Sequence, residues 1–91
     1  MKLILCAYCS DVVKGHFQPR ECKCGMSGVQ YLNQIDAVYW GEAIPLGFAN
    51  SSLQAAALDQ PESGMGEEFT AFVIPKVCPT FKKVDPPEGR V

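Results

Sequence analysis

Residues 6–9 read "CAYC" and residues 21–25 read "ECKCG". Each segment carries two cysteines close together, and twelve residues separate Cys9 from Cys22. Two close pairs joined by a short loop can bring four thiolates to one point, which is the ligand set of a structural zinc site. The sequence therefore predicts a zinc ion held by Cys6, Cys9, Cys22 and Cys24.

Other uses of these cysteines have weaker support. A thioredoxin-like redox site has a single C-x-x-C motif without a second pair, and structural disulfides need an oxidising compartment. Iron can use the same four ligands, so the spacing alone does not separate zinc from iron. Because four thiolates fill a tetrahedral site, we expect the metal to stabilise the fold rather than to perform catalysis.

Two further residues could take part in chemistry. His16 is the only histidine and could replace one cysteine as a ligand, but we expect it to lie in a turn or strand near the metal. Cys78 lies far from the cluster in sequence, and we expect a small, at least partly buried hydrophobe rather than a nucleophile. Since neither has an evident catalytic partner, we predict that the protein is not an enzyme.

Length, composition and charge indicate one small folded domain. The chain has 91 residues, of which 47% are hydrophobic, and a net charge of −2. No apolar run approaches a membrane span and "MKLILC" is too short for a signal peptide, so we expect a cytoplasmic location. Residues 25–75 contain six acidic residues and no lysine or arginine. This argues against nucleic-acid binding, except through a local patch that would include Lys14, Arg20 and Lys23.

Strand and turn signals divide the rest of the chain. The first strand is expected at "MKLILC", and residues 11–22 are expected to form a hairpin between the cysteine pairs. Gly41-Glu42 can close a second hairpin. Further strands are expected at 27–32, 37–41, 43–50 and 69–75.

Two of these strands carry a specific expectation. In residues 43–50, Pro45 and Gly47 lie on one face, and the proline suggests an edge or a bulge. Residues 69–75 are apolar on both faces apart from Thr70, which predicts a central, covered strand. In the strand expected at 43–50, the face opposite Pro45 and Gly47 carries Ile44, Leu46 and Phe48.

A short helix and a tail complete the predicted fold. Asn50, Ser51 and Ser52 are N-cap types, and "SLQAAALDQ" favours a helix that Pro61 ends. We predict a small α+β domain: an antiparallel sheet with an N-terminal four-cysteine, zinc ribbon-like hairpin and one short helix. Its parts are a zinc-bound lobe at 1–32, a sheet plus short helix at 33–75, and a basic, proline-rich tail at 76–91 that could be loose.

The roughly thirty residues 3–32 resemble a zinc ribbon, although the second pair is one residue shorter than the commoner C-x2-C. The whole chain resembles small, uncharacterised zinc-binding proteins of bacteria and their phages. That resemblance implies a compact zinc protein in a prokaryotic or viral setting, acting in the host cytoplasm if phage-encoded. The segments that carry it are "CAYC", "CKCG", "AVYWG", "IPLGFANSS" and "FTAFVIP".

Three binding hypotheses follow. Tyr39 and Trp40 lie on opposite faces of one strand: either both rings shield a core, or one is exposed as an anchor. The first hypothesis is a non-enzymatic protein that occupies or inhibits a protein partner, for instance a phage protein on a host factor, with a homo-oligomer as an option. The second is a nucleotide-like ligand stacked on either ring, with phosphate on Asn50 and Ser51 and charge from Arg20, Lys23 or Lys76. The third is a weak nucleic-acid-binding ribbon.

Overall fold

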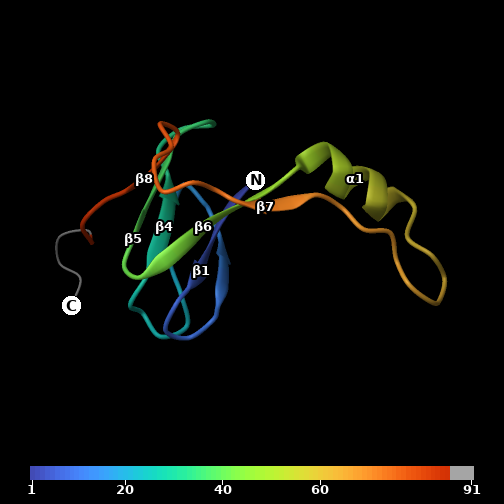
Figure 1. Cartoon of the computed structure of the whole chain (residues 1–91), viewed down its shortest axis with the longest axis horizontal. Coiled ribbons are helices and arrows are strands. Elements are labelled where there is room, and N and C mark those ends of the chain that lie inside the picture. The colour runs from blue at the N-terminus through green and yellow to red at the C-terminus, as the bar shows by residue number, and fades with distance from the viewer. Residues whose placement is uncertain (87–91) are drawn as a thin grey trace.

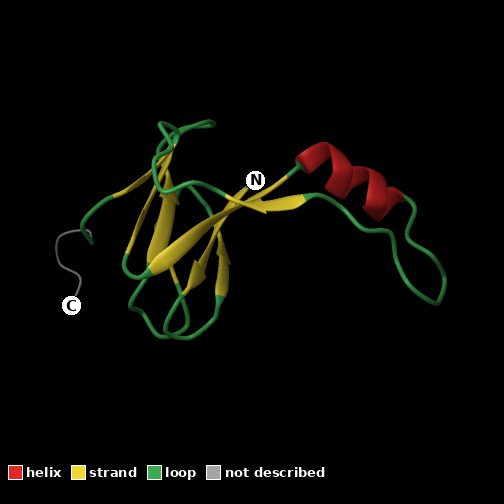
Figure 2. Ribbon diagram, viewed as in Figure 1, coloured by secondary structure: helices red, strands yellow, loops and turns green. Residues whose placement is uncertain are grey.

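The computed structural model describes residues 1–86, which form two four-stranded sheets and one helix (Figures 1 and 2). The predicted small α+β fold is confirmed. The first sheet has the order β2-β1-β6-β7 and is wholly antiparallel. The second has the order β3-β4-β5-β8, in which only β5 and β8 are parallel. The strands are β1 (Lys2–Cys6), β2 (Val12–Lys14), β3 (Arg20–Glu21), β4 (Gly28–Tyr31), β5 (Ala37–Trp40), β6 (Ala43–Phe48), β7 (Ala71–Val73) and β8 (Phe81–Lys83).

The hydrophobic core lies between the two sheets. Ile4 of β1 packs with Val29, Tyr39 and Phe81 from the second sheet, and all four are buried. The rings of Tyr39 and Phe81 meet nearly edge to face, with centroids 5.0 Å apart, a geometry that aromatic pairs favour. Side chains alternate along each strand, so β-branched and aromatic residues at every second position supply this inner layer.

The helix lies outside this sandwich. α1 (Asn50–Leu58) contains no buried residue, and residues 59–70 are all exposed. Together residues 49–70 form an arm that projects from the body, which comprises residues 1–48 and 71–86 (Figure 1). The projection gives the molecule extents of 46 × 26 × 22 Å. The arm is the long connection of the β6–β7 hairpin.

The structure does not form either predicted hairpin, the one over residues 11–22 or the one closed by Gly41-Glu42. β2 pairs with β1 and β3 pairs with β4, so the two halves of the 11–22 segment belong to different sheets. The chain crosses between the sheets over two residues: the Gly15 N–H donates to the Lys2 carbonyl in the first sheet, and the His16 carbonyl accepts from the Tyr31 N–H in the second. A second crossing follows β5, at Gly41, whose φ of +84° suits glycine.

Pro45 does not mark an edge, because β6 lies between β1 and β7. Pro45 faces Ile4 on β1, and its carbonyl accepts a hydrogen bond from the Ile74 N–H at 2.9 Å. Its missing N–H falls where β7 has just ended at Val73, so the ladder loses little there.

The strand expected at 69–75 is neither central nor covered. β7 is shorter and forms an edge of the first sheet, and its three residues are all exposed. Phe72 is apolar for a local reason: its ring lies over Gly47, where an added Cβ would come within 2.5 Å of it. The apolar character therefore reflects a partly covered edge rather than a central position.

The expectation that the tail beyond Pro79 is loose is wrong for β8. Phe81 is fully buried, and β8 pairs with β5, followed by a hydrogen bond from the Val84 N–H to the Tyr39 carbonyl at 2.8 Å. One aromatic residue that fills the core is enough to hold this segment to the sheet. Residues 87–91 of the predicted tail lie outside the described part of the chain.

The predicted helix is confirmed, but not its cap. The N-cap is Ala49, which has no side-chain cap, and Asn50 is already the first helical residue. Ser52 bonds instead with both ends of the arm: its hydroxyl donates to the Ala49 carbonyl and accepts from the Thr70 N–H, each at 2.9 Å. The serine therefore closes the base of the arm.

Candidate metal centre

The first cysteine pair lies in the turn between β1 and β2. Cys6 ends β1, and its N–H donates to the Asp11 carbonyl at 2.9 Å. The Ser10 N–H donates back to the Cys6 carbonyl at 2.9 Å. Ser10 directly follows Cys9 and has a φ of +60°, a conformation that costs a non-glycine residue free energy. We call this turn the first knuckle.

The second pair is built the same way between β3 and β4. The Cys22 N–H donates to the Ser27 carbonyl at 2.9 Å, and the Gly25 N–H donates to the Cys22 carbonyl at 3.0 Å. Gly25 directly follows Cys24 and has a φ of +78°. This second knuckle closes three residues after its first cysteine, whereas the first closes four residues after Cys6. The shorter spacing of the second pair thus fits a turn one residue tighter.

The four cysteines of the two knuckles meet. Their sulfur atoms all lie within 4.8 Å of one another. The Sγ of Cys24 is 3.7 Å from that of Cys6 and 3.5 Å from that of Cys22. A tetrahedral site with zinc–sulfur bonds of about 2.3 Å places its sulfurs about 3.8 Å apart. The cluster therefore has the donors and spacing to coordinate a metal ion, as the sequence predicts.

The cluster has an inner and an outer half. Cys6 and Cys22 are buried, Cys9 is partly buried and Cys24 is exposed. A bound ion would therefore lie at the rim of the body, with its inner ligands fixed by the ends of β1 and β3. Zinc and iron share this tetrahedral thiolate set, so the geometry alone does not separate them.

Two residues outside the cysteine pattern support the cluster. The Ser27 hydroxyl donates to the Cys6 sulfur at 3.5 Å, and both residues are fully buried. The Asp11 carboxylate accepts from the Lys23 N–H at 2.8 Å, which ties the first knuckle to the second. Such outer contacts orient ligands and tune the metal. No sequence signal marks Ser27 or Asp11 beyond their nearness to the cysteines.

The thiols do not ionise alike. The Ser27 hydroxyl, followed by the Cys9 backbone N–H, lowers the pKa of Cys6 to about 6. The Met26 N–H lowers the pKa of Cys24, but desolvation and the neighbouring sulfurs together raise it to about 12. Like charges this close oppose one another, so without a cation the cluster holds protons that metal binding would displace.

His16 and Cys78 lie apart from the cluster. The metal-binding group that the described residues form consists of the four cysteines without His16, whose Nδ1 accepts from the Gln18 N–H at 3.2 Å. Cys78 is partly buried against the core, as predicted. The Thr80 hydroxyl, 3.5 Å from its sulfur, lowers the pKa of Cys78.

The structure does not assemble the nucleotide site of the second hypothesis. Tyr39 and Trp40 are both buried, at 4% and 1% exposure, so the alternative in which both rings shield a core holds and the one in which a ring is exposed as an anchor does not. Trp40 also packs on Gly28. The Asn50 side chain accepts from the Met1 amino group at 2.9 Å, and Ser51 is exposed on α1.

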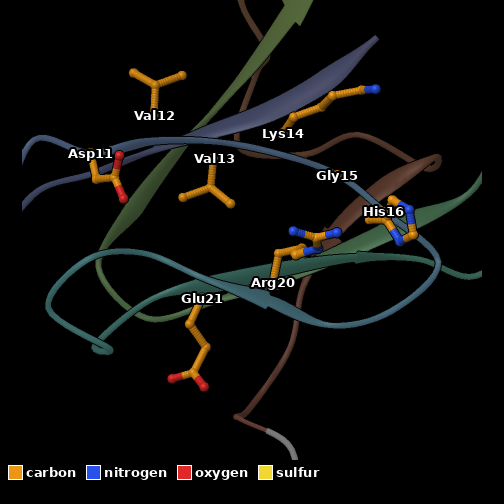
Figure 3. A pocket seen from close by; sticks show the side chains of 8 residues that line it. All are labelled: Asp11, Val12, Val13, Lys14, Gly15, His16, Arg20 and Glu21. Atoms are coloured by element: carbon orange, nitrogen blue, oxygen red, sulfur yellow. The ribbon is translucent and has the colours of Figure 1, made fainter.

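Arg20 and Lys14 line a groove of about 360 Å³ between β2 and β3 (Figure 3). The groove lies where the two halves of the expected hairpin run beside each other without pairing. Asp11 and Glu21 also line it, so its charge is mixed. Lys23, the third basic residue of the predicted patch, belongs to the second knuckle rather than to this groove.

A surface that the sequence did not predict lies on the first sheet. Ile4 and Val13 face the core, so their neighbours along the strands face outward. Register places outward residues side by side across β2, β1, β6 and β7. Val12, Ile44 and Val73 are 49%, 42% and 67% exposed. We call this surface the outer apolar face; its members are Leu5, Val12, Ile44, Leu46, Phe48 and Val73, and Leu3 in the same row is buried at 5% exposure.

Comparisons of the chain with known protein families, with curated proteins and with solved structures give no significant match. They therefore lend no support to the expected resemblance to zinc ribbons or to bacterial and phage proteins. Among residues 1–86, no helix has the length and apolar character to cross a membrane.

Proposed function

We propose that the protein is a non-enzymatic, zinc-stabilised binding protein that acts by occupying a surface of a protein partner. The observation that carries this proposal is the outer apolar face. Large aliphatic side chains cover it, while the core-facing side of β6 carries Pro45 and Gly47, which are buried. Contiguous exposed apolar patches are typical of sites where a protein contacts a partner.

The shape and chemistry of this face favour a protein over a small ligand. Small-molecule sites are concave and enclose most of their ligand, whereas the outer apolar face is one side of an open sheet. Lys14 is the charged residue at its margin, opposite Leu3 on β1. A partner with an apolar, weakly charged surface fits it best.

Zinc is the proposed metal because it prefers a closed tetrahedral set of four thiolates in structural sites. The two knuckles come from different sheets, so an ion held by both would join the sheets at one end. Four protein ligands leave no coordination position for a substrate or a water, which supports a structural role and not a catalytic one.

Two alternatives have less support. A nucleotide-like ligand would lack the stacking rings of Tyr39 and Trp40, which are buried. A nucleic acid would meet Lys14 and Arg20 in the groove, but Asp11 and Glu21 offset them. Nucleic-acid binding would appear as salt-dependent retention on heparin, and a nucleotide as a thermal shift.

The test uses the full chain with metal bound as bait, followed by titration of each purified captured protein. Ile44→Asp puts a charge in the middle of the outer apolar face, and we expect it to weaken binding at least about tenfold. Gln54→Asp adds the same charge on the exposed arm and should leave the affinity unchanged. Equal binding by wild type and Ile44→Asp, or capture of nucleotides or nucleic acid alone, would contradict the proposal.

A further inference from the structure

The edge strand β7 offers an unpaired row of backbone groups. The Ile74 N–H donates to Pro45 and the Thr70 carbonyl accepts from the Ala49 N–H, each at 2.9 Å. Even-numbered residues of this segment therefore direct their backbone groups toward β6. By the alternation of an antiparallel ladder, Ala71 and Val73 direct their N–H and carbonyl groups away from the sheet.

This edge lacks the usual protection against pairing with another strand. Natural edges carry charges, prolines or covering segments, yet residues 69–74 hold no charge and no proline. The arm continues β6 and β7 outward from the body rather than folding back over the sheet (Figure 1). By contrast, the opposite edge strand β2 carries Lys14 and runs beside β3.

The sequence around β7 is complementary to itself. Residues 68–76 read "EFTAFVIPK", with Glu68 and Lys76 at equal distances from Phe72. When two copies run antiparallel with the two Phe72 residues opposite each other, Glu68 of each copy lies across from Lys76 of the other. We propose that the protein forms a two-fold symmetric dimer by this pairing of β7, which joins the two first sheets into one continuous sheet.

The hydrogen-bond pattern fits this register. It sets Ala71 opposite the partner's Val73, and both residues have outward backbone groups, so each such pair can exchange two hydrogen bonds. Phe72 then forms the closer, non-hydrogen-bonded pair with the partner's Phe72, and its ring is 50% exposed before pairing. If the register shifted by one residue, the outward backbone groups of one copy would face backbone groups of the other copy that already bond to β6.

Charge selects among the remaining registers. Pairing centred on Ala71 would set Glu68 opposite Ile74, and pairing centred on Val73 would set Lys76 opposite Thr70 and Pro75 opposite Ala71. Pro75 has no N–H to give: centred on Val73 it opposes Ala71 within β7, whereas centred on Phe72 it opposes Phe69, outside the strand. The register centred on Phe72 alone both pairs Glu68 with Lys76 and keeps proline off the hydrogen-bonding positions of β7.

The dimer is independent of the proposed function. It uses the edge of the first sheet, whereas partner binding uses the outer apolar face, and the dimer would bring two such faces together. Failure of Ile44→Asp to affect partner binding would leave the dimer standing. A monomeric protein would overturn the dimer and leave partner binding standing.

The test is sedimentation equilibrium of the metal-bound chain over a range of concentrations, without any partner. We expect a reversible dimer. Glu68→Lys and Lys76→Glu each put like charges opposite at two symmetric places, and each should weaken dimerisation about tenfold. The double variant Glu68→Lys/Lys76→Glu restores opposite charges and should return to the wild-type affinity. Glu62→Lys makes the same charge change in the arm, outside the paired segment, and should have no effect.

A second variant tests the ladder itself. Val73→Pro removes an N–H that points to the partner and none that bonds to β6, so metal content should stay and the dimer should be lost. The proposal is overturned by a monomer at every concentration, by a double variant no better than the single ones, by equal weakening with Glu62→Lys, or by a Val73→Pro protein that dimerises normally.

Discussion

The body and the arm are held together in different ways. The body has a core shared by two sheets and a cysteine cluster that joins two knuckles. The arm has a helix without a buried residue, a serine that closes its base, and one ring contact between Phe48 and Phe69 at 5.2 Å. Non-local contacts therefore define the body, while local helix formation defines most of the arm. Changes in the body should be costly and changes in the arm should not.

The largest expected effect breaks the metal cluster. Cys6→Ser replaces a fully buried ligand, and structural zinc contributes about 10–16 kcal/mol of apparent binding free energy in small zinc domains. We expect loss of bound metal and of cooperative unfolding, measured by native mass spectrometry and by calorimetry. Cys78→Ser, outside the cluster, should keep one metal per chain. Full metal content in Cys6→Ser would contradict the site.

A core truncation tests the division between body and arm directly. Phe81→Ala removes a fully buried ring and should lower the unfolding free energy by about 3–5 kcal/mol. Leu58→Ala changes an arm residue that is 88% exposed and should change it by less than about 0.5 kcal/mol. Urea denaturation of the metal-bound proteins measures both. Similar losses in the two variants would mean that the arm shares the stability of the body.

Two glycines each lie against an aromatic ring, and the two rings differ in how freely they can move. An added Cβ at Gly28 would lie 2.2 Å from the buried Trp40 ring, and one at Gly47 would lie 2.5 Å from the Phe72 ring. Trp40 has no room to move, so Gly28→Ala should cost about 1–3 kcal/mol. The half-exposed Phe72 can turn away, and Gly47→Ala should cost less than about 1 kcal/mol. Chemical denaturation gives the free energies, and Trp40 fluorescence should change in Gly28→Ala alone.

The smallest expected effect is a difference in sign between substitutions in the first and the second knuckle. Ser10 and Gly25 occupy the same place, and both have a positive φ. Ser10→Gly should raise the unfolding free energy by about 0.5–1 kcal/mol, whereas Gly25→Ala should lower it by about 1 kcal/mol. Thermal unfolding of the metal-bound forms distinguishes the two signs. A loss of stability in Ser10→Gly would show that the serine side chain does more than tolerate the turn.

Cysteine spacing was a good guide to the cluster, because ligand chemistry restricts both residue type and distance. Cys6, Cys9, Cys22 and Cys24 meet as the pattern predicts. Ser27 and Asp11 were missed because a hydroxyl or a carboxylate near a cysteine has many other uses. Their roles emerge only when the two knuckles are brought face to face.

Strand positions could be predicted more reliably than strand partners. Every expected strand exists near its predicted place, since alternation and β-prone residues are local signals. Pairing is a non-local choice, and the chain crosses between sheets at Gly15 and at Gly41 where a hairpin was expected. Phe81 completes a sheet from a segment whose prolines and lysines indicate a tail. Its single aromatic side chain outweighs that composition.

The position of the arm within one hairpin has a consequence for how such a chain can diverge. Phe48 and Ala71, the residues on either side of the arm, already face each other across β6 and β7. The segment between them can therefore be shortened, lengthened or exchanged at little entropic cost and without moving a metal ligand. It is a natural place for inherited insertions, and a practical place to graft a foreign loop.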